Sequence, residues 1–160
     1  MTNAAPPDRR ATMLADELEH SRQRFFAALD ALPPARRDAP GLIGEWSSRE
    51  LVAHMGYWAG HTTEAIHHVE QGRADAFDVD PPSTDERNAT VARVARETDP
   101  GTVGRREEAS VRALVIRLQR MDPALLDVVL PDGGTLEEQV RVDGPDHFAE
   151  HAAELEAVAR

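Results

Sequence analysis

The chain has 160 residues, a length that suits one well-packed domain, and carries 29 acidic against 18 basic residues for a formal charge of -11. This excess of negative charge argues against nucleic acid or an anionic membrane as a partner, because the field of the protein repels phosphate groups. The absence of cysteine and lysine excludes thiolate nucleophiles, cysteine-based zinc sites and Schiff-base chemistry, so a metal must be held by histidine, aspartate or glutamate.

The N-terminal residues 1–10, MTNAAPPDRR, have no apolar core. We interpret them as a disordered lead-in that is not a signal peptide, and we expect residues 11–160 to form a single domain. No apolar run approaches the roughly 20 residues that span a bilayer. These features favour a soluble cytoplasmic protein.

Apolar residues at helical spacing predict a first helix over residues 14–32, which Pro33 and Pro34 end. Residues 33–46 are rich in proline and glycine and are typical of a loop. A second helix then begins, because Ser47 and Glu50 match a capping box and Trp46 and Leu51 match a hydrophobic staple. We expect this helix to continue to about Gly72.

Further helices are predicted in the second half of the chain. The turn-like residues 74–84 lead into a shorter helix over residues 84–97, and a third long helix ends at Asp122 and Pro123. We interpret residues 125–142 as a loop, with a small hairpin as the alternative. The last helix begins near Pro145, behind an acidic cap in residues 143–146.

Four main amphipathic helices without a convincing set of strands predict an all-α protein with the architecture of a four-helix bundle. In such bundles, side chains from facing helices build metal sites in the interior.

His147 and His151 lie four residues apart on the last predicted helix, so both imidazoles lie on one face and can reach one metal ion. A helical wheel at about 100 degrees per residue places both at the edge of the apolar stripe. His54 and His61 occupy the corresponding edge of the second helix, and the wheel does not choose between them. Three histidine nitrogens suit Zn²⁺, Ni²⁺ or a similar ion with open positions for water or substrate.

Other interpretations of these histidines stay open. Seven histidines in 160 residues produce about 0.3 pairs at this spacing by chance, so surface or hydrogen-bonded histidines are one alternative. Residues 147–151 also match H-x-x-E-H, the inverted zincin motif, although those proteases need a further ligand well beyond it and nine residues follow His151. Glu150 lies about 60 degrees from His147 on the wheel and is the candidate catalytic residue, with a solvated carboxylate as the alternative.

Two motifs together resemble a known family. Residues 46–58, W-S-x-x-x-L-V-A-H-M-x-x-W, and residues 146–151, D-H-F-A-E-H, look like the two signature regions of the DinB/YfiT-like proteins. The similarity covers most of the chain in length and helix order. It implies a four-helix bundle with a three-histidine metal site, and by position it assigns His54, rather than His61, to the site with His147 and His151.

The resemblance also implies a function. Members of this family are described as metal-dependent hydrolases, and several branches transfer mycothiol, bacillithiol or related thiols; the related mycothiol-dependent maleylpyruvate isomerases carry an extra C-terminal domain. We therefore expect a metal-dependent transferase that activates a mycothiol-like thiol for attack on a small electrophile, with Trp58 and His61 as candidates for the pocket wall. Core packing is the competing role for Trp58. The alternatives are a hydrolase that uses water at the metal, or a non-catalytic bundle that binds a metal ion or a small molecule or forms a homodimer.

Overall fold

The computed structural model describes residues 6–160, so residues 1–5 of the predicted lead-in lie outside the described residues. Within residues 6–160 the chain is helical, and β-structure is limited to two isolated bridges. The prediction of an all-α protein is confirmed. The elements are α1 (Arg10–Asp30), α2 (Pro34–Asp38), α3 (Ser48–Glu70), η1 (Ala74–Ala76), α4 (Thr84–Arg96), α5 (Pro100–Arg120), η2 (Pro123–Asp127), α6 (Leu136–Asp143) and α7 (Pro145–Val158). None of the helices described is long and apolar enough to cross a membrane.

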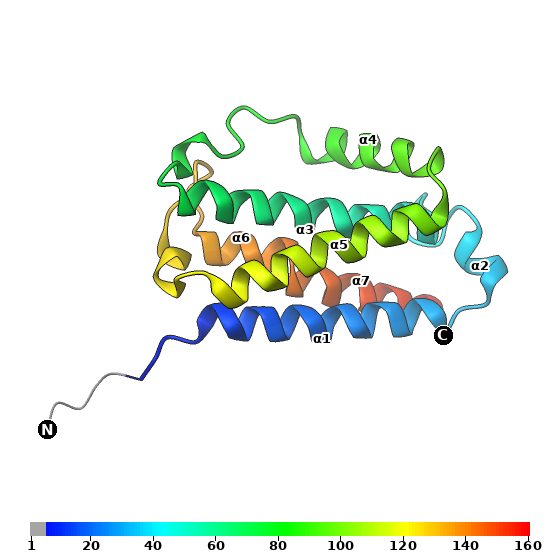
Figure 1. Cartoon of the computed structure of the whole chain (residues 1–160). Helices are drawn as coiled ribbons and strands as arrows, with labels where there is room; N and C mark the ends of the chain where they lie inside the picture. The colour runs from blue at the N-terminus through cyan, green and yellow to red at the C-terminus, as the bar shows by residue number, and fades with distance from the viewer. Residues whose placement is uncertain (1–5) are drawn as a thin grey trace, which may run out of the picture.

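The long helices α1, α3, α5 and α7 lie side by side and enclose the apolar core (Figure 1). The most extensive contacts join α3 to α5 and α1 to α7. Phe25 of α1 and Phe148 of α7 are fully buried, with their rings edge to face and their centroids 5.5 Å apart. Burying a side chain of this size stabilises the fold by roughly 1.5–3 kcal/mol. The core therefore holds α7, which carries two of the candidate ligands, against α1.

Gly56 sets the crossing of α3 and α5. A Cβ atom at this position would lie 2.9 Å from the Cα atom of Glu107 on α5, which is closer than side chains tolerate. The two backbones therefore approach each other at a point where only glycine fits. Because Gly56 is two residues after His54, this contact also fixes the position of α3 near the candidate site.

The start of α3 has the predicted capping box. The Glu50 Oε2 atom accepts hydrogen bonds of 2.8 Å from both the backbone N–H and the hydroxyl of Ser47. Arg96, at the end of α4, donates to the other Glu50 oxygen. Burial raises the pKa of Glu50, but the hydrogen bonds from Ser47 and Arg96 outweigh it, so the pKa lies below its usual value. The capping box thus also joins α3 to α4.

The interpretation of residues 125–142 as a loop is wrong, because this segment contains most of η2 and of α6. Thr135 caps α6 in a second capping box: its backbone N–H donates to Glu138 Oε2 at 2.7 Å, and its hydroxyl accepts from the Glu138 N–H at 3.2 Å. Leu136 and Val140 are fully buried. Burial of these two side chains against the core stabilises a helix of eight residues that would be too short to form alone.

Two further expectations about loops and caps need correction. The predicted loop over residues 33–46 contains the short helix α2. Pro145 occupies the first turn of α7 as expected, but the N-cap residue is Gly144 and no side chain caps this helix. Asp143 instead ends α6, and its carboxylate bonds to side chains of α3 and α6. The reason is that α6 passes directly into α7. No loop separates the two helices, so no acidic side chain is placed to accept a hydrogen bond from the first backbone N–H groups of α7.

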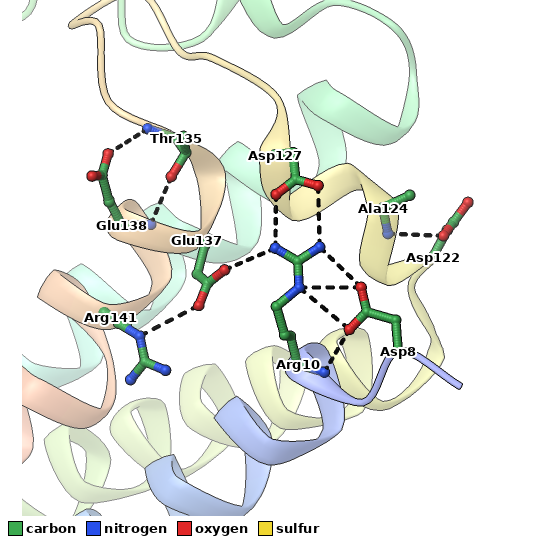
Figure 2. A network of polar contacts seen from close by, with 9 residues as sticks. All are labelled: Asp8, Arg10, Asp122, Ala124, Asp127, Thr135, Glu137, Glu138 and Arg141. Atoms are coloured by element: carbon green, nitrogen blue, oxygen red, sulfur yellow. Dashed lines mark hydrogen bonds and ion pairs between the residues drawn. The ribbon is translucent and has the colours of Figure 1, made fainter. Parts of the chain in front are cut away.

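An ion-pair network ties the start of α1 to the segment before α7 (Figure 2). The Arg10 guanidinium donates to Asp127 of η2 at 2.7 Å and to Glu137 of α6 at 3.1 Å, and it also pairs with Asp8. Glu137 in turn contacts Arg141 one turn later. Because water screens exposed pairs of this kind, each adds little to stability, and the network mainly sets the position of η2 and α6 relative to α1.

Candidate metal centre

Three histidines from two helices meet in the interior: His54 of α3 and His147 and His151 of α7. One ring nitrogen from each residue lies within 4.8 Å of the other two. The Nε2 atoms of His54 and His147 are 2.8 Å apart, and the ring centroids of His54 and His151 are 5.3 Å apart. These are the three residues that the sequence indicated, and the group could hold a metal ion.

Gly144 places α7 so that this meeting occurs. A Cβ atom at Gly144 would lie 2.5 Å from the carbonyl oxygen of Val140, so only glycine allows α6 to pass directly into α7. His147 then lies in the first turn of α7, and His151 follows one turn later on the same face.

The surroundings keep the rings of His54 and His147 neutral. His54 is buried, and burial together with the neighbouring His147 and His151 lowers its pKa to about 3. Burial also lowers the pKa of His147 to about 4, with a further contribution from His151 and an opposing one from Asp143. At neutral pH both rings are therefore uncharged, and each presents a nitrogen lone pair, which is the form that binds metal.

The protein alone does not satisfy the hydrogen bonding of these rings. Among residues 6–160, the buried Nδ1 atoms of His54 and His147 have no hydrogen-bond partner. Where two neutral imidazoles contact each other through Nε2, one ring donates its N–H and the other accepts with its lone pair. That lone pair then serves only the other histidine. A buried polar atom without a partner costs roughly 1–3 kcal/mol. Neutral imidazole nitrogens with incomplete hydrogen bonding suit a borderline divalent ion such as Zn²⁺ or Ni²⁺. The rings of His54 and His147 would have to move apart so that both nitrogens could bind the same ion.

Glu154 orients the third histidine. Its Oε2 atom lies 2.6 Å from Nδ1 of His151, three residues earlier on α7. A carboxylate at Nδ1 keeps the proton there and leaves Nε2 free as a ligand, and this arrangement is common behind metal-binding histidines. Glu154 was not among the site residues predicted from the sequence. Its spacing from His151 on one helix face was the signal that could have identified it.

A cavity of about 610 Å³ adjoins the histidine group. His54 and His147 contribute to its wall, together with Trp58, His61, Arg87, Asn88, Asp143 and Glu150. Trp58 is almost fully buried, and its indole N–H donates to Asn88 Oδ1 at 3.0 Å. Trp58, His61 and Glu150 thus all line the cavity, while the substrate and catalytic roles that we predicted for them stay predictions.

His61 lines the cavity but has partners at both ring nitrogens. Its Nδ1 atom lies 3.2 Å from Asp143 Oδ2, and its Nε2 atom lies 3.0 Å from a guanidinium nitrogen of Arg87. The same Asp143 oxygen accepts hydrogen bonds from Thr62 and Gln139. With both nitrogens engaged, His61 has no lone pair to offer a metal ion. It belongs to a polar network beside the histidine group.

The remaining histidines lie elsewhere. His67 and His20 are exposed, and His68 is 4.0 Å from Glu64 near the end of α3. No protein-family model, curated protein or solved structure matches this chain. The resemblance to the DinB/YfiT-like family, which was based on two sequence motifs and the helix order, therefore stays a prediction. The structure itself supports an all-helical protein with a three-histidine group that could hold a divalent metal ion.

Proposed function

We propose that the protein is a DinB/YfiT-like four-helix bundle that acts as a metal-dependent transferase, activating a mycothiol-like thiol for attack on a small electrophile. The observation that carries this proposal is the meeting of His54, His147 and His151 beside a cavity of about 610 Å³, whose wall includes His54 and His147. The packing of α1, α3, α5 and α7 around one core supports the bundle.

Each histidine has a defined part in this proposal. His54, His147 and His151 would hold the ion through their ring nitrogens. Burial keeps His54 and His147 neutral, and Glu154 holds His151 in the tautomer that leaves Nε2 free to bind. A divalent ion held there lowers the pKa of a thiol or water bound to it and polarises an electrophile. Three protein ligands leave further positions for a cosubstrate.

The composition of the chain supports a borrowed nucleophile. The protein has no cysteine or lysine, so a covalent intermediate on either side chain is excluded. A low-molecular-weight thiol would supply the sulfur instead, and the cavity would hold the electrophile close to it. Trp58 gives this cavity an apolar surface, and Arg87 and Asn88, which both contact Trp58, offer polar contacts beside it.

Glu150 favours a hydrolase as the second candidate. It is exposed at the cavity wall close to His147, on the same turn of α7. A carboxylate in this place can accept the proton of an attacking water molecule, which is the role of a general base. In that case water would replace the thiol as the nucleophile.

The test is an assay with the electrophilic dye monochlorobimane, comparing mycothiol, bacillithiol and glutathione with the zinc-loaded and the metal-stripped protein. We expect a thiol adduct to form faster with the zinc-loaded protein, and the variant His54→Ala to lose this acceleration. His67→Ala is the matched control, because His67 lies on the same helix with an exposed side chain. If no thiol reacts faster with the loaded protein, the transferase proposal is wrong.

A parallel assay addresses the hydrolase. Ester and amide substrates are incubated with the zinc-loaded protein in the absence of any thiol, and Glu150→Gln is compared with the wild type. Metal-dependent hydrolysis that the Gln variant loses would support the hydrolase in place of the transferase. A protein that binds zinc but accelerates neither reaction would be a metal-binding bundle.

A further inference from the structure

A second cavity of about 400 Å³ lies between α3, α4 and α5. It shares no lining residue with the cavity beside the histidine group. Helix α4 lies along α3 on the side away from α1 (Figure 1), and this cavity opens along its second half. The two cavities are therefore lined by different residues of α3 and α4, and the histidine group does not account for the second one.

The short side chains of α4 produce this space. The buried residues of α4 are Ala92 and Ala95, so the second half of this helix buries only methyl groups against its neighbours. Longer side chains lie at the sides of the gap, and Val91, Val94 and Val103 present apolar walls to it. An apolar cavity of this size binds water poorly and favours the apolar part of a ligand.

One end of the cavity is basic. Arg106 of α5 lines it and is exposed, and within residues 6–160 its guanidinium forms no ion pair. Ser110, one turn later, adds a hydroxyl to the same wall. These groups can donate hydrogen bonds to a carboxylate, which a guanidinium binds through two parallel bonds.

The neighbouring acidic residue does not oppose such a ligand. Glu107 also lines the cavity, but both of its carboxylate oxygens accept hydrogen bonds from Arg22 of α1, at 2.8 and 2.7 Å. The Glu107 side chain is fully buried in this pair. Arg22 of α1 therefore neutralises the charge of Glu107, and Arg106 is the charged group that would face a ligand.

We propose that this cavity binds a small amphipathic carboxylate, with its apolar body beneath α4 and its carboxylate on Arg106. The site is separate from the proposed transferase or hydrolase activity and does not need the metal. Because the protein as a whole carries a charge of -11, its overall field disfavours anions. Binding of a carboxylate must then depend on the local contact with Arg106.

The experiment measures binding of octanoate by calorimetry and by chemical-shift mapping, with octan-1-ol and octylamine as ligands of matched apolar length. We expect octanoate to bind at least about tenfold more tightly than the alcohol, since a charge-assisted contact contributes at least this factor. Resonances of Val94 and Ser110 should shift on binding. Metal-stripped protein should bind octanoate as tightly as zinc-loaded protein, which separates this result from the outcome of the transferase assay.

Two variants complete the test. Arg106→Gln should lower the affinity for octanoate to that for octan-1-ol, whereas Arg105→Gln, at an exposed neighbour that does not line the cavity, should leave it unchanged. Val94→Trp, at a half-exposed position on the rim, should obstruct the cavity without disturbing the core. The proposal is overturned if octanoate does not bind saturably, if the alcohol binds equally well, or if Arg106→Gln binds octanoate like the wild type.

Discussion

His54 and His61 lie two turns apart on the same edge of α3, yet their ring nitrogens meet different neighbours. His61 lies between the Asp143 carboxylate and the Arg87 guanidinium, so both of its nitrogens are engaged. His54 faces the imidazoles of His147 and His151, and its Nδ1 atom has no partner among the residues described. Position on the helix does not distinguish a ligand from a structural histidine. The difference comes from what the neighbouring helices bring to each ring.

The largest expected effect separates these two histidines directly. His54→Ala removes one of the three nitrogen ligands, so we expect the affinity for Zn²⁺ to fall by more than about 100-fold. This loss exceeds the loss that follows mutation of residues that only hydrogen-bond to a metal ligand. His61→Ala should change it by less than about threefold, because this ring has no free nitrogen. The measurement is a competition titration with a chromophoric chelator, together with elemental analysis. Equal losses for the two variants would place His61 in the site.

The next effect tests how His151 is oriented. Glu154→Gln should weaken zinc binding by about 10–100-fold, because the amide holds the proton on Nδ1 of His151 less well than the carboxylate does. Glu156→Gln is the control: it lies two residues later on α7 and pairs with Arg24 at 2.7 Å, away from the histidine group. The same titration measures both variants. Unchanged affinity in Glu154→Gln would show that the contact between Glu154 and His151 does not orient the ligand.

The third effect concerns the network around His61. Asp143→Ala removes the acceptor for Thr62 and Gln139 and the partner of His61, so we expect the free energy of unfolding to fall by about 1–3 kcal/mol. Urea unfolding of the metal-free protein measures this change. Asp146→Ala, at an exposed residue three positions later, should have an effect below about 1 kcal/mol. A loss for Asp143→Ala no greater than for this control would show that the network does not stabilise the fold.

The smallest effect is a dependence of stability on pH. The pKa values of His54 and His147 in the fold, about 3 and about 4, lie below the ordinary histidine pKa of 6.5. At pH values between the folded and the ordinary pKa, the unfolded chain therefore binds more protons than the folded protein. The free energy of unfolding of the metal-free protein should therefore fall as the pH falls below 6.5, by about 1 kcal/mol for each of the two histidines at pH 5.5.

Unfolding in urea at pH 7.5 and 5.5 measures this dependence. The variant His54→Gln should lose about half of it, whereas the matched control His67→Gln should keep all of it because His67 is exposed. A wild-type protein that is equally stable at both pH values would contradict the neutral, buried state of the two rings.

Several features follow from the sequence because they depend on neighbours along the chain. The pairing of His147 and His151 follows from helical spacing, and the capping box of Ser47 and Glu50 follows from a separation of three residues. The long helices were predictable for the same reason, since their apolar stripes extend over many turns. By contrast, α6 was missed although Thr135 and Glu138 carry the same capping signal. Eight residues contain too few turns for an apolar stripe to stand out from a loop.

By itself, then, the sequence determined the helical class of the protein and the shared face of His147 and His151, since both are local properties of the backbone. Only the tertiary structure decided that His54 meets His147, 93 positions away, and that Asp143 and Arg87 contact the two ring nitrogens of His61. Likewise, the unpartnered Nδ1 atoms and the cavity beneath α4 exist only once the helices have packed. These features depend on the angle and register at which helices cross, and those are set by close contacts such as that of Gly56 with Glu107, which no short stretch of sequence encodes.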